Sequence, residues 1–173
     1  MCAHSKWAHM ASIPHDKTFH TQFVQFTSVK HFESKYIKNM SLQVKIMTPD
    51  KIFFNQEAEE IILPTNTGQM GVLSNHAPLI TALDIGVMLV RSQNTWTPLA
   101  LMGGFALVKQ NEVTVLVNEA ESASTIDANE AEKSFEAAKV KLEEATNQKQ
   151  KVEATFAFKR ERARYQVVKQ IQR

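Results

Sequence analysis

Hydrophobic and polar residues alternate between residues 41 and 124, as in β-strands that bury one face. The stretch "LQVKIM" is the clearest case, because Leu42, Val44 and Ile46 alternate with polar residues. Eight comparable runs follow along the chain: "KIFFNQ", "EIILP", "GVL", "LITAL", "GVMLVR", "WTPLALM", "GFALVK" and "EVTVLVN". Short strands that recur every 8 to 12 residues or so are typical of β-sandwiches and barrels.

Segments rich in turn-forming residues separate these runs, and we expect turns at "TPDK", "TNTGQMG", "SNHAP", "DIG", "SQNT" and "QNE". The pair Gly103-Gly104 interrupts an apolar run and predicts a tight hairpin or a bulge with positive φ. No helical pattern lies between the runs, whereas parallel strands need long crossover connections. The pattern therefore predicts an antiparallel β-sandwich domain over residues 40–125.

The pattern becomes helical at Ile126. Asp127 is a candidate N-cap, with Glu130 three residues later in a capping-box arrangement. Apolar residues at spacings of three and four form one stripe on this first helix: Ala131, Phe135, Ala138, Leu142 and Ala145. A second helix is expected over about residues 149–170, and its stripe holds Val152, Phe156, Ala163 and Val167.

Two amphipathic helices joined by so short a connection predict an antiparallel hairpin over residues 126–173. The predicted fold class is therefore mixed, β then α: an N-terminal antiparallel β-sandwich followed by a C-terminal two-helix antiparallel hairpin. Both stripes are narrow and rich in alanine, so the hairpin buries little apolar area. We expect it to be held weakly on the sandwich and to be a mobile element.

Residues 1–39 show neither helical nor strand periodicity, and only Asp16 and Glu33 are acidic. The segment lacks the arginine that a transit peptide usually carries. Its five histidines have no spacing that suits a defined metal site. We interpret it as a disordered extension, with the folded protein starting near Met40.

Length and composition limit the kinds of protein that this chain could be. A length of 173 residues suits one domain with an appendage. Cys2 is the single cysteine, which excludes an internal disulfide and a cysteine-based zinc site. With 20 basic and 18 acidic residues, the whole chain demands no polyanionic partner. No apolar run approaches the roughly 20 residues that cross a bilayer, so membrane contact is expected only through partners.

The stretch "GQMGVLSNHAPLITALDIG" raises the question of a catalytic histidine, since His76 lies near Ser74 and Asp84 in sequence. Ser74 has no nucleophile-elbow context, and His76 is the one histidine of the predicted folded part. The glycines are not followed by the Gly-Lys-Ser/Thr of a phosphate-binding loop. We therefore predict no catalytic residue, no cofactor and no metal, and interpret His76 as an interface residue.

The C-terminal segment "KRERARYQVVKQIQR" carries a local surplus of positive charge. Cations near a helix C-terminus complement the helix dipole, which is sufficient to explain some of them. Arg160 and Arg164 are one turn apart and project from the same side, and arginine suits bidentate capture of carboxylates. Nucleic acid is the other anionic partner, but no recognised binding fold or aromatic stacking motif accompanies the run.

Two stretches, "EIILPTNTGQMGVLSNHAPLITALDIG" and "ALMGGFALV…EVTVLVNEAE", resemble the epsilon subunits of F-type ATP synthases. The likeness includes the block G-x-x-G-V-L-x-x-H-A-P-L in order and runs from about Met40 to the C-terminus. The residues of these stretches are more similar to those of the chloroplast and cyanobacterial branch than to those of the mitochondrial one. A peripheral location is thereby implied, on the stromal side of the chloroplast thylakoid membrane or on the cytoplasmic side of a cyanobacterial one.

This resemblance implies a non-catalytic central-stalk subunit that turns with the rotor. The sandwich of such a subunit binds the gamma subunit and rests on the c-ring, with His76, Ala77 and Pro78 as our candidates for the gamma contact. Its hairpin swings between a folded-down position and one extended toward the alpha and beta subunits, where it restrains ATP hydrolysis. Our candidates for contact with an acidic segment of beta are Lys159, Arg160, Arg162 and Arg164.

One motif departs from the family pattern. Some bacterial relatives bind ATP through I/L-D-x-x-R-A at the start of the first helix, and the matching stretch here runs from Ile126 to Ala131. Glu130 stands where that arginine would be, and a carboxylate repels phosphate. We therefore expect no ATP sensing. The alternative to a rotor subunit is a free-standing β-sandwich module whose basic helical arm binds an acidic protein or nucleic acid.

Overall fold

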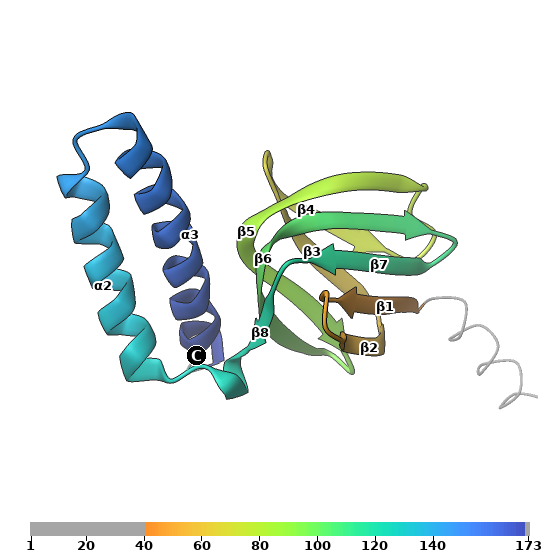
Figure 1. Ribbon diagram of the computed structural model, residues 1–173. Coiled ribbons are helices and arrows are strands. Elements are labelled where there is room, and N and C mark those ends of the chain that lie inside the picture. Colours follow the sequence, from red (N-terminus) through yellow and green to blue (C-terminus); the bar gives the residue numbers. More distant parts are fainter. Residues whose placement is uncertain (1–40, 172–173) are drawn as a thin grey trace, which may run out of the picture.

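The computed structural model describes residues 41–171, which form a β-sandwich with a helical hairpin beside it (Figure 1). The strands are β1 (Leu42–Met47), β2 (Ile52–Ala58), β3 (Glu60–Thr65), β4 (Gly68–Leu73), β5 (Leu79–Ser92), β6 (Thr95–Lys109), β7 (Glu112–Val117) and β8 (Ala120–Ser122). A short 3-10 helix, η1 (Ala123–Thr125), leads to α2 (Ala128–Glu144) and α3 (Gln148–Ile171). The predicted order of β-sandwich and then helical hairpin is confirmed. The extension predicted at residues 1–39 lies outside the described residues.

The strands hydrogen-bond in the order β2-β1-β7-β6-β5-β3-β4, and β8 pairs with β6. Neighbouring strands run antiparallel with one exception, since β1 and β7 run parallel. Our expectation that no strands would pair in parallel is wrong at this place. The crossover argument applies to strands that follow each other closely, whereas the whole chain from β2 to β6 separates β1 from β7.

The long strands β5 and β6 bend in the middle, and this corrects two predicted turns. The "DIG" segment lies inside β5, and the Gly103-Gly104 pair lies inside β6. The pair nevertheless has the positive φ that we predicted, 71° at Gly103 and 152° at Gly104. A Cβ added to Gly104 would be 2.0 Å from the carbonyl oxygen of Leu116, so this backbone contact needs glycine.

The predicted turn "TNTGQMG" is also shorter in the structure than in the sequence pattern. Gly68 to Leu73 form β4, which pairs with β3, and the turn is confined to the two residues between them. Pro64 lies within β3, where the β3–β5 register shifts between Ile62 and Thr65. A proline has no N–H to donate, so a break in the pairing with β5 accommodates it.

The alternation of apolar and polar residues along β1 buries the three apolar side chains in the sandwich core, as predicted. Leu42, Val44 and Ile46 have no solvent exposure, and the residues between them are at least partly exposed. They pack with buried side chains of the neighbouring strands, among them Ile61, Val72, Met88, Leu101, Val108, Val113 and Val115. This dense core makes the sandwich the rigid part of the chain.

The helical hairpin begins at the predicted cap. The side-chain oxygen Oδ1 of Asp127 accepts a 2.8 Å hydrogen bond from the backbone N–H of Glu130. Asn147 caps α3 in the same way through the N–H of Gln150, also at 2.8 Å. The two helices pack on each other through Phe135, whose ring stacks on Tyr165 at a centroid distance of 5.0 Å.

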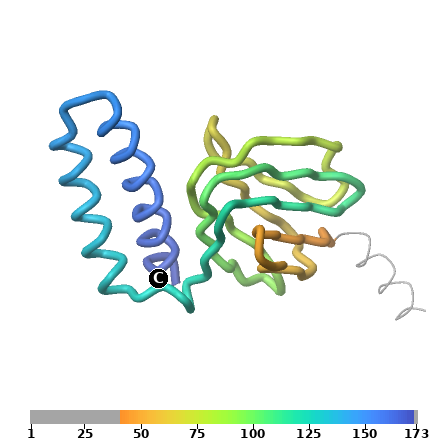
Figure 2. Tube along the Cα trace, viewed as in Figure 1, coloured from red at the N-terminus to blue at the C-terminus, as the bar shows by residue number. Residues whose placement is uncertain are grey.

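The predicted apolar stripe of α3 is correct in its C-terminal half only. Ala163 and Val167 are buried, whereas Val152 is 45% exposed and Phe156 is 58% exposed. In Figure 2 the C-terminal part of α3 comes closest to the strands, and the N-terminal part has α2 as its neighbour. The stripe therefore continues beyond the part of α3 that the sandwich covers.

Candidate functional site

The contact of α3 with the sandwich has a small apolar centre. Ala163 and Val167 of α3 pack with Val87, Ala100 and Met102 of β5 and β6. Ile126 and Ala131, at the start of the hairpin, belong to the same cluster. Five of these seven buried side chains are alanine or valine, so few methyl groups are removed from water.

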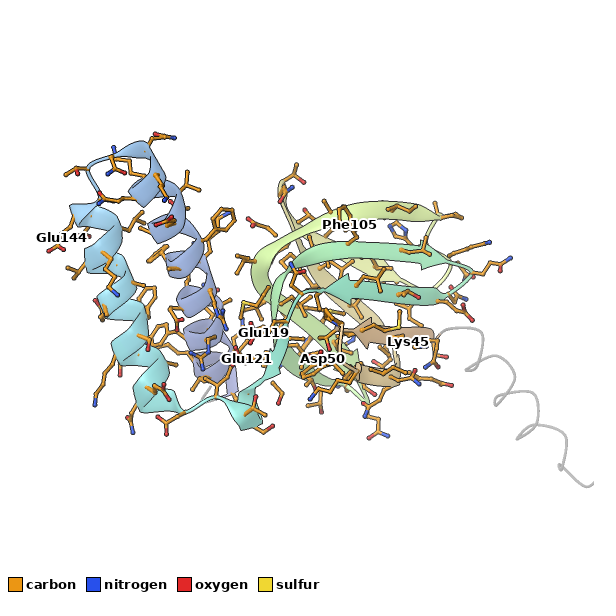
Figure 3. The ribbon with its side chains drawn as sticks, viewed as in Figure 1. Lys45, Asp50, Phe105, Glu119, Glu121 and Glu144 are labelled. Atoms are coloured by element: carbon orange, nitrogen blue, oxygen red, sulfur yellow. The ribbon has the colours of Figure 1, made fainter. Side chains whose placement is uncertain are left out.

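Ion pairs surround this apolar centre. The Lys159 Nζ atom lies 2.7 Å from Oδ2 of Asp84 on β5. Arg160 pairs at 2.8 Å with Glu119, and Arg164 pairs at 3.1 Å with Glu121. Figure 3 shows Glu119 and Glu121 on the segment that lies between α3 and the strands. Each of these pairs joins α3 either to β5 or to residues 119–121 at and just before β8.

Asp84 is held in its ionised form by its surroundings. Partial burial raises the pKa of this carboxyl. The hydrogen bonds from Lys159 and from the backbone N–H of Ile85 lower the pKa and together outweigh the effect of burial. The Ile85 N–H lies 2.8 Å from Oδ1, so both carboxylate oxygens have a donor. The pKa of Asp84 is consequently below its usual value, which keeps the pair with Lys159 charged near neutral pH.

Arg164 is the most enclosed cation of the contact, with 21% of its side chain exposed. Desolvation lowers its pKa, but the charges and hydrogen bonds of Glu121 and then Glu161 raise it more, so the pKa lies above the usual value. Its two carboxylate partners come from different elements, since Glu161 is on α3 and Glu121 on β8. Arg164 therefore ties the strand to the helix within a small network.

This arrangement holds the hairpin without locking it. Partly exposed ion pairs contribute about 0.2–1 kcal/mol each, because water competes for both partners. The apolar centre is small, and salt screens the ion pairs that surround it. The contact is therefore weak, as the alanine-rich stripes predict, and release of the hairpin stays a prediction.

Three of the four predicted basic residues form ion pairs with carboxylates outside the hairpin. Lys159, Arg160 and Arg164 all face carboxylates of the sandwich end. Arg162 is exposed and lines the same cavity as Lys159 and Asp84, whereas Arg160 and Arg164 line another one. Whether any of the four contacts a beta subunit stays a prediction.

Sequence reasoning missed the three carboxylates that receive these cations. Asp84 is a charged residue inside a strand of apolar residues, which is a signal that we assigned to a turn. Glu119 and Glu121 alternate with alanine at the end of the sandwich, a period-two pattern that places both on one face. The pairing of these acids with α3 depends on tertiary contacts that no local pattern contains.

His76 has no catalytic surroundings. It lies between β4 and β5, and its Nδ1 is 2.8 Å from the carbonyl oxygen of Ala77. In the described part of the chain no hydrogen bond joins His76 to Ser74 or Asp84, and Asp84 is engaged with α3. Ala77 and Pro78 are exposed beside it, so the three predicted interface residues form one surface segment.

An exposed apolar face adjoins this segment. Ile80 of β5 is 72% exposed and is paired in register with Leu107 of β6, and Phe105 is 60% exposed opposite Leu116 of β7. We call Ile80, Phe105, Leu107 and Leu116 the outer apolar face. Figure 3 shows Phe105 among the strands, away from the helices. An exposed cluster of large apolar side chains is typical of an interaction surface.

Within residues 41–171 there is no group of three or more histidine, cysteine or acidic side chains that could hold a metal ion. Among the helices of the described region, none has the length and apolar character needed to span a bilayer. Glu130 occupies the first turn of α2, where its backbone N–H completes the Asp127 cap.

Two family models together match almost the whole described region. The model "ATP synthase, Delta/Epsilon chain, beta-sandwich domain" matches residues 41–123, and the model "ATP synthase, Delta/Epsilon chain, long alpha-helix domain" matches residues 124–169. The chain is 74% identical over 132 residues to the chloroplastic ATP synthase epsilon chain of Chlorella vulgaris, which covers 76% of this chain and 98% of the relative. The corresponding chain of Chlamydomonas reinhardtii is 59% identical over 136 residues, with 75% and 96% covered.

Solved structures agree on the fold. A chain of the Euglena gracilis mitochondrial ATP synthase structure, described as OSCP/F1/c-ring, superposes with a TM-score of 0.64 at 20% identity, over 77% of this chain and 82% of that one. A chain of the central stalk and c-ring of the Tetrahymena thermophila mitochondrial ATP synthase gives 0.55 at 17% identity, over 73% and 96%. The chain therefore belongs to the ATP synthase delta/epsilon family, among its epsilon chains, which are non-catalytic subunits.

Proposed function

We propose that the chain is the rotor subunit that couples gamma to the c-ring in a chloroplast F-type ATP synthase, and that its hairpin restrains ATP hydrolysis. The high identity to chloroplastic epsilon chains supports this place in the complex. The names of the structural neighbours, which include F1, c-ring and central stalk, agree with it. The stromal side of the thylakoid membrane is the location that follows from this assignment.

The observation that carries the inhibitory part is the ion-paired contact of α3. Lys159, Arg160 and Arg164 face the sandwich while the hairpin is docked, and their charges are used within the chain. Release of α3 frees all three, and exposed Arg162 lies on the same turns of the helix. A released α3 is thus a basic helix suited to an acidic segment of the beta subunit, and the docked form is the non-inhibitory one.

The outer apolar face supports the coupling part. It continues from His76, Ala77 and Pro78 onto β5, β6 and β7, on strands that belong to the rigid sandwich. A cavity of 370 Å³ borders Phe105 and Leu116 and offers space for an apolar side chain of a partner. The gamma subunit is the occupant that the family assignment favours, and the hairpin remains free to move while this face is covered.

The experiment uses an ATPase complex depleted of its epsilon chain. The full chain and a chain truncated before Ile126 are added, and both gamma binding and the rate of ATP hydrolysis are measured. The proposal expects both to bind gamma and only the full chain to lower the rate. Equal inhibition by the truncated chain would contradict the role of the hairpin, and failure of both to bind gamma would favour the free-standing binding module.

A further inference from the structure

The turn between β6 and β7 meets the segment that carries His76. We call residues 76–78 the His76 segment; β5 follows it directly and begins at Leu79, which is paired with Val108 near the end of β6. The turn that follows β6 contains Asn111 and therefore lies beside the residues that lead into β5. In Figure 1 this turn is at the end of the sandwich away from the helices.

Asn111 contacts both the sandwich and the chain just before the His76 segment. Its side-chain oxygen Oδ1 accepts a hydrogen bond from the backbone N–H of Asn75, 36 positions earlier, with 2.5 Å between the two atoms. Its backbone carbonyl oxygen accepts a 2.8 Å hydrogen bond from the N–H of Gln43 at the start of β1. Asn111 therefore connects the residue before His76 to a strand of the sandwich core.

The chain turns sharply just before the His76 segment. The N–H of His76 donates a 3.2 Å hydrogen bond to the carbonyl oxygen of Leu73, and Asn75 between them has a φ of 63°. Residues other than glycine adopt positive φ infrequently, so contacts from outside the turn help to hold it. The His76 segment is consequently held at both ends, by Asn111 before it and by the pairing of β5 with β6 after it.

We propose that Asn111 is a positioning residue for binding of the gamma subunit: its side chain holds the His76 segment in the conformation that gamma recognises. This inference rests on the proposed function, in which the His76 segment contacts gamma. A segment that is ordered before binding loses less conformational entropy when a partner covers it. Asn111 thus strengthens gamma binding through the segment that it orders.

A second turn of the chain separates this role from the role of Asn111 in its own turn. The β5–β6 and β6–β7 turns share the sequence Gln-Asn and nearly the same conformation, with φ of 50° and 61° at Gln93 and Asn94, and of 52° and 63° at Gln110 and Asn111. Asn94 is exposed, and its side chain makes no hydrogen bond to another residue of the range 41–171. Asn94 is therefore the matched control for Asn111.

Three variants of the full chain test the proposal. Asn111→Gly keeps a residue that adopts positive φ readily but removes the Oδ1 acceptor, whereas Asn111→Asp keeps an acceptor and tolerates positive φ. Asn94→Gly makes the first change in the other turn. Surface plasmon resonance with immobilised gamma gives the affinities. Amide hydrogen exchange followed by NMR on the isolated chain gives the protection of the Asn75 N–H.

We expect Asn111→Gly to weaken gamma binding about 2–12-fold, the net effect of one hydrogen bond, and to lose the protection of the Asn75 N–H. Asn111→Asp and Asn94→Gly should keep the wild-type affinity and the wild-type protection. Rescue by aspartate distinguishes positioning through the hydrogen bond from a general loss of turn stability, which glycine at either turn would cause equally.

Wild-type affinity of Asn111→Gly would overturn the proposal, and so would an equal loss of affinity in Asn94→Gly or in Asn111→Asp. Exchange of the Asn75 N–H at the same rate in the wild-type chain and in Asn111→Gly would overturn it as well. A wild-type chain that does not bind gamma would contradict the proposed function, and with it the effect of Asn111 on affinity. The exchange measurement needs no gamma, so the two failures are distinguishable.

Discussion

Lys159 Nζ on α3 lies 2.7 Å from Oδ2 of Asp84 on β5, a residue 75 positions earlier in the chain. The contact joins the hairpin to the middle of β5, which belongs to the longest strand pair in the sandwich. Together with the pairs Arg160–Glu119 and Arg164–Glu121 it surrounds an apolar centre of small side chains. Charged pairs and apolar packing therefore both contribute to the docked position of the hairpin.

A double-mutant cycle on Asp84 and Lys159 measures the first of these pairs. We expect each alanine variant to lower the docked fraction of the hairpin, and the double variant to lower it less than the sum. The side chains are 31% and 38% exposed, so a coupling energy of about 0.2–1 kcal/mol is expected. Energy transfer between a dye on α3 and a dye on the sandwich reports docking. A coupling energy of zero would mean that the pair contributes nothing.

The same pair predicts a pH dependence. The folded pKa of Asp84 is lowered, so its stabilising effect is present above the unfolded pKa of about 3.9 and is lost as the pH falls through the folded value. We expect wild-type docking to exceed that of Asp84→Asn by a constant margin at higher pH, and the two to converge as the pH falls below about 4. The same energy-transfer assay gives both curves. A margin that persists in acid would contradict the ionised pair.

Gly104 should be intolerant of substitution, because a Cβ there meets the Leu116 carbonyl oxygen at 2.0 Å and the φ of 152° disfavours other residues. Gly104→Ala is expected to lower the free energy of unfolding by at least about 1–3 kcal/mol, measured by urea denaturation. Gly71→Ala is the matched control, since a Cβ at Gly71 has nothing within 4 Å. Its effect should stay within about 1 kcal/mol. Equal losses in the two variants would refute the steric argument.

The outer apolar face predicts which residues gamma binding needs. Phe105→Ser should weaken binding of gamma by about 1–4 kcal/mol and leave the stability nearly unchanged, because Phe105 is 60% exposed. His76→Ala should weaken gamma binding as well. Ile52→Ser is the control, since Ile52 is 56% exposed but lies on β2, outside this face. Affinities come from surface plasmon resonance with immobilised gamma. A larger loss for Ile52→Ser than for Phe105→Ser would place the gamma surface elsewhere.

Much of the fold could be predicted from local pattern. Alternation placed Leu42, Val44 and Ile46 in the core, and the change of period at Ile126 marked the start of the hairpin. The Asp127 cap followed from the residue types alone. These features depend on neighbours within a few residues, which a sequence pattern contains.

The features that the pattern missed depend on distant neighbours. The "DIG" segment has turn-forming residues, but pairing with β6 on one side and with α3 on the other keeps Asp84 inside a strand. Phe156 matches the apolar stripe, yet it is exposed because α3 extends beyond the sandwich. The basic residues of α3 were identified as a group, but their intramolecular partners Glu119 and Glu121 become evident only in the folded chain.

The central claim is that Asp84, Glu119 and Glu121 hold the α3 cations, for which we propose an inhibitory role, in the docked form. Its most direct test is the triple variant Asp84→Lys, Glu119→Lys, Glu121→Lys, which leaves every hairpin residue unchanged. Loss of three pairs should shift docking by about 0.6–3 kcal/mol, or roughly 3–150-fold. The control, Arg160→Glu with Arg164→Glu, also loses pairs that hold the hairpin but reverses two of the positive charges of α3.

The rate of ATP hydrolysis is measured after each variant is added at saturation to the epsilon-depleted ATPase. We predict that the triple variant lowers the rate below that of the wild-type complex, and that the control inhibits less than the wild-type chain. A triple variant that binds gamma normally yet inhibits no more than the wild-type chain would contradict the account.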